Sequence, residues 1–134
     1  MKRVKAILCI LLTIMLLPMI GCSRLSVSEN GSYKVVYQYA DISFSEELTA
    51  EEAAAVVQIL NGKVKTQSWL GTPSCGFDKN IAIVINGTRY ALACDKCTTL
   101  KVYGAANTYI ELTQAERDVL EAIFTIRGGK FPCI

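Results

Sequence analysis

The sequence predicts an α+β domain in which an antiparallel sheet carries two helices packed on one face and is stapled by disulfides. Three observations lead to this expectation. Helix-capping signals stand at two places, short runs of β-forming residues precede and separate them, and Asn86-Gly87 marks a tight hairpin. The resulting order is strand, helix, several strands, helix, which is typical of helices gathered against an antiparallel sheet.

The first strand is expected over residues 33–40, which are rich in β-forming side chains. Four apolar or aromatic residues alternate there, so they share one face of the strand: Tyr33, Val35, Tyr37 and Tyr39.

A helix follows the first strand. Thr49 and Glu52 match the capping box, in which each side chain satisfies a free backbone N–H of the first turn. Asn61-Gly62 supplies the end of the helix. Its apolar residues recur at helical spacing, at Ala53, Val56, Val57 and Leu60.

The middle of the chain predicts further strands. Residues 63–70 form one candidate, with Trp69 near its end. Residues 81–85 and 88–93 flank Asn86-Gly87, the residue pair that a two-residue type I′ turn favours because both central residues need positive φ. Two shorter candidates are residues 100–103 and 109–112.

The last element is expected to be a second helix. Thr113 and Glu116 repeat the capping box, and Gly128-Gly129 ends the helix. Its predicted apolar stripe comprises Val119, Leu120, Ile123 and Phe124.

Composition limits the chemistry. The chain has 134 residues, which favours a single domain, and it contains no histidine. A Ser-His-Asp or Cys-His catalytic site and any histidine-ligated metal are therefore excluded. We expect no cofactor and no metal, and no enzyme activity.

Residues 1–21 have the pattern of an export signal. Lys2, Arg3 and Lys5 make a basic start, and residues 6–17 are almost wholly apolar. That run is shorter than the roughly 20 apolar residues that a membrane-spanning helix needs. The pattern predicts a cleaved signal peptide.

The signal ends with Met19-Ile20-Gly21-Cys22. These residues resemble the lipobox of bacterial lipoproteins, in which Leu is commonest at the position of Met19. The resemblance covers residues 1–22 only. It implies cleavage before Cys22, a diacylglycerol thioether on the Cys22 sulfur, and a cell-membrane anchor on the extracytoplasmic side. Residues 22–32 are then expected to be a lipidated tether and residues 33–134 a single domain.

Removal of the signal changes the charge of the protein. The loss of Lys2, Arg3 and Lys5 lowers the basic residues from 14 to 11, against 12 acidic residues. A net charge near −1 gives no basic patch, so we expect no nucleic-acid partner.

Cysteine is the most informative residue type of the domain. Cys75, Cys94, Cys97 and Cys133 make an even count in an exported chain, which predicts disulfides. Extending the hairpin register outward pairs Lys79 with Cys94 and brings Cys75 beside Cys97. This favours Cys75–Cys97 with Cys94–Cys133, and leaves Cys75–Cys94 with Cys97–Cys133 as an alternative.

Two other interpretations of the cysteines are open. Cys94 and Cys97 form a Cys-x-x-Cys motif, which could serve a thiol-disulfide oxidoreductase, but strand-forming residues follow it instead of a helix. The four thiolates could also bind zinc, although such sites usually show two Cys-x-x-Cys motifs and only one is present.

Other candidate sites are weaker. An acidic cluster before and within the first helix is better explained by the helix dipole than by catalysis: Asp41, Glu46, Glu47, Glu51 and Glu52. Aromatic residues that could form a binding surface are Tyr33, Tyr37, Tyr39 and Trp69. We therefore expect an anchored, non-catalytic domain that binds an unknown protein or envelope ligand, with an oxidoreductase or a structural subunit of an envelope complex as alternatives.

Overall fold

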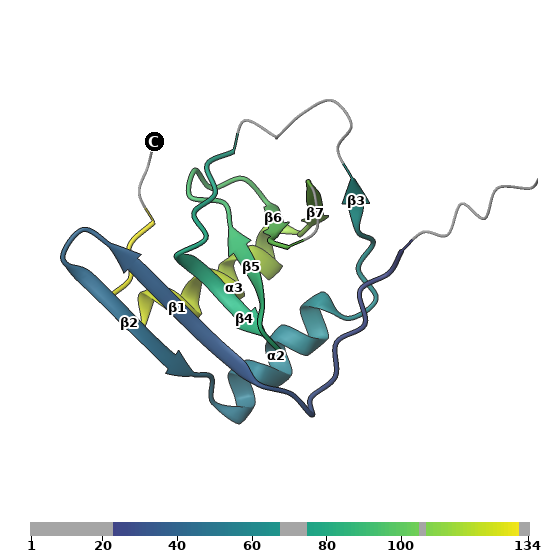
Figure 1. The fold of residues 1–134 in the computed structure, drawn as a ribbon, viewed down its shortest axis with the longest axis horizontal. Coiled ribbons are helices and arrows are strands. Elements are labelled where there is room, and N and C mark those ends of the chain that lie inside the picture. The colour runs from purple at the N-terminus through teal and green to yellow at the C-terminus, as the bar shows by residue number, and fades with distance from the viewer. Residues whose placement is uncertain (1–22, 68–74, 105–106, 132–134) are drawn as a thin grey trace, which may run out of the picture.

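A computed structural model of the chain describes residues 23–67, 75–104 and 107–131. Seven antiparallel strands form one sheet in the order β2-β1-β4-β5-β6-β7-β3 (Figure 1). The strands are β1 (Tyr33–Tyr39), β2 (Ile42–Glu47), β3 (Thr66–Gln67), β4 (Ile81–Ile85), β5 (Thr88–Leu92), β6 (Thr99–Val102) and β7 (Thr108–Glu111).

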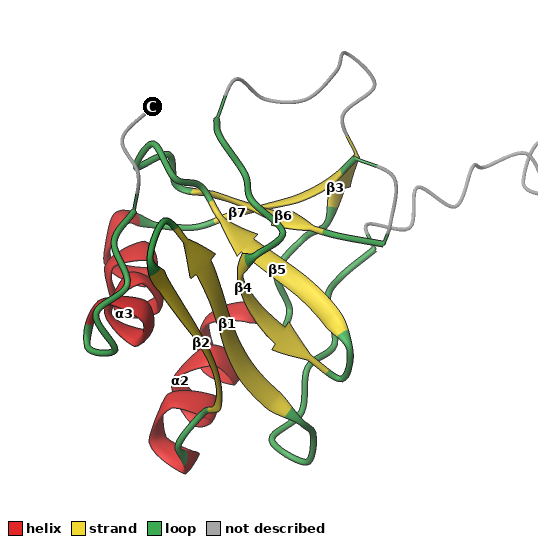
Figure 2. Ribbon diagram, turned by 60° about the vertical axis from the view of Figure 1, so that its left-hand side comes forward, coloured by secondary structure: helices red, strands yellow, loops and turns green. Residues whose placement is uncertain are grey.

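Two helices, α2 (Ala50–Leu60) and α3 (Gln114–Thr125), lie on the same face of this sheet (Figure 2). The predicted α+β class is therefore confirmed. The core lies between the helices and the sheet, where apolar side chains of both layers are fully buried, among them Val35, Ile81, Leu100, Ile110, Val56, Leu60, Leu120 and Phe124.

The central hairpin has the predicted turn. Asn86 and Gly87 have φ values of 49° and 85°, which only the left-handed region allows and which Asn and Gly adopt most readily. Ile85 pairs with Thr88 and Ile83 with Tyr90, as predicted. The regular ladder ends at Ala82 and Ala91, so its predicted extension to Lys79 is not formed as strand pairing.

Strand β2 was not predicted. Its residues Ile42 and Phe44 are half-buried on the helix-facing side, while Ser43 and Ser45, which alternate with them, are exposed. The alternation is present in the sequence, but the neighbouring acidic residues concealed it. The predicted strand over residues 63–70 is reduced to β3, and its end, including Trp69, lies outside the described residues.

The predicted tether over residues 22–32 is corrected by the structure. Leu25 and Val27 are only 9% and 8% exposed and belong to the core. Leu25 exchanges backbone hydrogen bonds with the loop after α2, donating to the Lys63 carbonyl and accepting from the Gly62 N–H. Two apolar residues separated by one serine thus add a short extended segment to the domain, so the folded part begins before residue 33.

Both predicted capping boxes are formed. In α2 the Thr49 hydroxyl accepts from the Glu52 N–H at 3.2 Å, and the Glu52 carboxylate accepts from the Thr49 N–H at 2.9 Å. In α3 Thr113 and Glu116 do the same at 3.2 and 2.8 Å.

Each capping glutamate also pairs with a cation that follows the other helix. Arg127, just after α3, binds both oxygens of Glu52 at 2.8 Å and also contacts Glu46 at 2.9 Å. Lys63, just after α2, lies 2.6 Å from Glu116. We call these two contacts the reciprocal clamp. Because each joins the start of one helix to the end of the other, α2 and α3 must run antiparallel.

The clamp shifts the acidity of both glutamates. Hydrogen bonds from Arg127 lower the pKa of Glu52, although partial burial opposes them. Burial disfavours the charged form of Glu116, but hydrogen bonds from Lys63 and Thr113 outweigh it and lower its pKa. Both carboxylates are therefore held ionised at neutral pH.

We predict that Arg127→Met lowers the free energy of unfolding at pH 7 by about 2 kcal/mol, because it leaves the partly buried Glu52 without its charged donor. Since the folded pKa of Glu52 is lowered, this stabilisation is present above the unfolded value of about 4.3 and is lost as the pH falls through the folded pKa. Urea titrations at neutral pH and down to about pH 3 measure both effects.

Lys34→Met is the matched control. The side chains of the Lys34–Glu47 pair are 47% and 65% exposed, so its loss is expected to change stability by less than about 1 kcal/mol. Equal losses for the two variants, or a deficit of Arg127→Met that persists unchanged at low pH, contradict the prediction.

Candidate functional site

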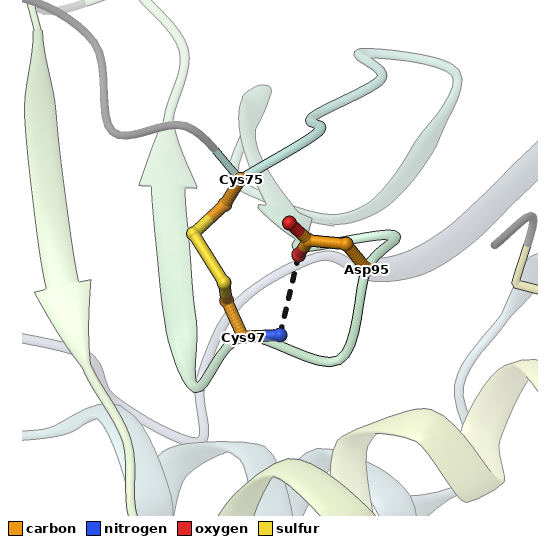
Figure 3. A group of neighbouring side chains, drawn as sticks. All are labelled: Cys75, Asp95 and Cys97. Carbon is orange, nitrogen blue, oxygen red and sulfur yellow. Dashed lines mark hydrogen bonds between the residues drawn. A yellow bond between two sulfur atoms is a disulfide. The ribbon is translucent and has the colours of Figure 1, made fainter. Parts of the chain in front are cut away.

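One disulfide is formed within the described residues. Cys75, which lies before β4, is bonded to Cys97 in the loop between β5 and β6, with a Cα–Cα distance of 6.2 Å (Figure 3). The predicted Cys75–Cys97 bond is therefore confirmed, and the alternative Cys75–Cys94 pairing is wrong.

Local backbone contacts bring the two cysteines together. The Cys94 N–H donates to the Gly76 carbonyl at 2.7 Å, so the segment before β4 still runs beside the end of β5. The Asp95 carboxylate accepts the Cys97 N–H at 3.2 Å and closes the turn, in which Lys96 has a φ of 67° (Figure 3). The predicted bond is correct, but the extended register is not: it paired Lys79 with Cys94, whereas Gly76 lies opposite Cys94, three residues away from the predicted partner.

Cys94 differs from Cys75 and Cys97, which are bonded to each other. It is 2% exposed, and it forms no disulfide with any residue that the structure describes. Its predicted partner, Cys133, lies outside the described residues, so the Cys94–Cys133 bond stays a prediction.

The surroundings of Cys94 oppose thiolate formation. Burial, followed by the negative charge of Asp78, raises the pKa of the Cys94 thiol. Reactive cysteines need a lowered pKa and some exposure. In addition, Cys97 is bonded to Cys75, so the Cys-x-x-Cys motif does not hold a Cys94–Cys97 disulfide. These features do not favour the oxidoreductase alternative.

Three possible metal ligands lie close together, but two of them are bonded to each other. One ligand atom each of Cys75, Asp95 and Cys97 lies within 4.8 Å of the others. The two sulfur atoms are bonded to each other, however, and a disulfide sulfur is not the thiolate that zinc requires. The three residues could ligate a metal only after reduction.

Arg117 of α3 binds the loop that contains Cys97, and this contact was not predicted. It is fully buried on α3, donates to the Cys97 carbonyl at 2.7 Å, and lies 3.2 Å from Glu121. Its guanidinium also lies 5.7 Å from the centre of the Phe131 ring. Its spacing before Leu120 and Phe124 places it on the buried stripe, and this was the signal available in the sequence.

The tyrosines of β1 are mainly core residues. Tyr33 and Tyr37 are 4% and 1% exposed, and their hydroxyls donate to the carbonyls of Ser28 and Lys130. They offer a partner almost no surface, because the face that they share is the one that the helices cover. Tyr39 is 45% exposed at the end of the strand, and Trp69 lies outside the described residues.

A groove lies between α2 and α3 on the outer side of the helical layer. One part, of about 230 Å³, lies between Glu51 and Ala55 of α2 and Ala122 of α3, and is also lined by Ile126, which directly follows α3. A second part, of about 430 Å³, continues it towards the start of α3. Ala55 and Val119 line both parts, so the two adjoin, and we call them together the helix groove.

The helix groove corrects the predicted apolar stripe of α3. Leu120, Ile123 and Phe124 are buried as predicted, but Val119 is 46% exposed and lines the groove. Val119 precedes Leu120 by one position, which is a rotation of about 100° around the helix axis, so its side chain faces α2 and solvent instead of the sheet.

Comparison with protein-family models, with curated proteins and with solved structures gives no match to this chain. Among the described residues, neither helix has the length and the apolar character needed to cross a membrane.

We predict that the double variant Cys75→Ser/Cys97→Ser loses about 3 kcal/mol of stability, because a bond across a separation of 22 residues restricts the unfolded chain. Thermal unfolding with and without a reductant measures this loss. Wild type is expected to be sensitive to the reductant and the double variant much less so. Equal sensitivity of both proteins contradicts the assignment.

We also predict that Cys94 is inert in the folded protein, because its thiol is buried and its pKa is raised. Native protein treated with a maleimide should carry no label at Cys94, and it should not accelerate the reduction of insulin. After unfolding without a reductant, labelling of Cys94 indicates a free thiol, and its absence supports the Cys94–Cys133 bond. Rapid labelling of native Cys94 contradicts the prediction.

Proposed function

We propose that this chain is a membrane-anchored, extracytoplasmic lipoprotein whose folded domain binds a partner and has no catalytic role. The anchor is the lipid on Cys22 that the resemblance of Met19-Ile20-Gly21-Cys22 to a lipobox implies. Two or more acyl chains hold a protein at a bilayer where one chain binds only marginally, because each buried methylene contributes about 0.8 kcal/mol.

The observation that carries this proposal is the Cys75–Cys97 disulfide. Disulfides persist in oxidising, exported environments and are rare in the reducing cytosol. The bond therefore supports the export that the signal pattern at residues 1–21 predicts from different residues.

The binding role is supported by the open helix groove on the described surface. The sulfur atoms are locked in a disulfide or buried, whereas the helix groove is open and exposes Val119 and Ile126 at 46% and 70%. A stable subunit role in an envelope complex would use the same kind of surface. Copurification of a stoichiometric partner from solubilised membranes would favour that version of the proposal.

We predict that Cys22→Ser abolishes acylation, since serine lacks the sulfur that carries the thioether. The intact mass of wild-type protein purified from membranes should equal the chain from Cys22 plus the diacylglycerol group. The variant should lack this added mass and should no longer fractionate with membranes as wild type does. Cys9→Ser is the control, because Cys9 belongs to the cleaved signal, and it should leave the final mass unchanged.

A full-length, unacylated wild-type chain in the cytosol contradicts the proposed anchor. Comparison of alkylated samples with and without prior reduction reports the number of bonded sulfurs in the same experiment.

A further inference from the structure

Helix α3 carries two apolar faces, of which only one is used by the core. Leu120 and Phe124 are fully buried against the sheet. A second set of apolar or small residues recurs at spacings of four, three and four along the groove: Ala115, Val119, Ala122 and Ile126. Isolated exposed apolar residues need no explanation, but these lie in one line on the same side of the helix.

The groove exists because its walls are built from small side chains. Ala55 of α2 and Ala115 and Ala122 of α3 are too short to fill the space between the two helix axes. The reciprocal clamp closes the helix pair at both ends and leaves this middle part open. The 11 residues of α2 correspond to about 16 Å, so the groove has room for about three turns of a further helix.

The charges along the groove have one sign. Glu51, Glu52 and Glu116 line it, and no lysine or arginine is among the lining residues that the structure describes. The nearby cations are occupied, since Arg127 is paired with Glu52 and Lys63 with Glu116. The exposed carboxylate of Glu51 is therefore the charge of the lining that an approaching molecule meets.

We infer that the helix groove binds a basic amphipathic helix of a partner protein, an inference that rests on the proposed binding function. The apolar stripe of such a helix covers Val119 and Ile126, and its lysines or arginines meet the carboxylates at the rim. An anionic membrane surface or a second copy of this acidic helix pair would place like charges against Glu51.

The probe is a synthetic peptide of about 14 residues, or four helical turns, with leucines at i, i+3, i+4 and i+7 and lysines elsewhere. The control peptide replaces the lysines with glutamates. Fluorescence anisotropy of the labelled peptides measures binding to the full chain, kept in an uncharged detergent. We expect binding of the basic peptide and not of the acidic one.

Two variants test the groove itself. Val119→Asp places a charge on its apolar floor, and Glu51→Lys reverses the charge at its rim. Each is expected to weaken binding by about tenfold, which corresponds to about 1.4 kcal/mol.

Each variant has a matched control elsewhere on the surface. Val64→Asp changes a valine of similar exposure, 43% against 46%, that does not line the groove. Glu47→Lys makes the same change of net charge on the face of the sheet opposite to the helices. Both controls should bind within about twofold of wild type, which is under 0.5 kcal/mol. Melting curves of all four variants verify that each is folded.

Equal binding of the two peptides, or wild-type affinity in both groove variants, overturns the inference. The inference is also overturned if the basic peptide does not bind and the wild-type chain instead self-associates or binds anionic vesicles. If Val119→Asp abolishes that interaction, the groove belongs to this different occupant. The anchor is tested separately: a failed mass prediction for Cys22 with intact peptide binding removes only the proposed location. A correct mass without peptide binding removes only this inference.

Discussion

The arrangement of this domain depends on the reciprocal clamp between its two helices. Glu52 and Glu116 each cap their own helix and each bind the cation that follows the other helix. Two carboxylates thus determine where both helices begin, that the helices are antiparallel, and how far apart their ends lie. The cations complete the clamp at helix C-terminal ends, where the helix dipole also favours positive charge; Arg127 even donates to the Ile123 carbonyl at 2.7 Å. The ion pairs hold α2 and α3 together at their ends, and the groove lies between them, where alanines line both helices.

The disulfide provides a second constraint at the other side of the domain. It joins the segment before β4 to the loop after β5, and buried Arg117 connects that loop to α3 through the Cys97 carbonyl. The sheet and the helical layer are therefore linked through side chains as well as through the core. The same construction explains why neither cysteine is expected to be reactive: Cys97 is bonded to Cys75, and Cys94 of the same loop is buried, where burial and Asp78 raise the pKa of its thiol.

The features that could be predicted from sequence are those that depend on neighbouring residues. Both capping boxes and the Asn86-Gly87 turn follow from local spacings, whereas the hairpin count brought Cys75 only to the correct region of the chain, because the register shifts by three residues beyond the ladder. The clamp was not predicted, because Arg127 is 75 residues from Glu52 and Lys63 is 53 residues from Glu116. β2 and the buried residues Leu25 and Val27 were missed because serines and acidic residues interrupt their short apolar patterns. The groove could not be predicted without the position of α2, because the sequence periodicity alone assigned Val119 to the core.

The position of the first described residues bears on where a partner can bind. Lys65 donates its N–H to the Ser23 carbonyl, and Leu25 is bonded to the loop that carries Lys63. The chain therefore joins the folded domain one residue after Cys22, at the end of the helix groove where Lys63 meets Glu116. If Cys22 carries the lipid, as we propose, no long flexible tether separates that end from the bilayer, and the reach of the domain is set by its own dimensions. A partner helix in the groove would then have to be presented close to the membrane surface. Lysines that complement Glu51 would also draw such a helix towards anionic headgroups, so the same basic character would serve both contacts.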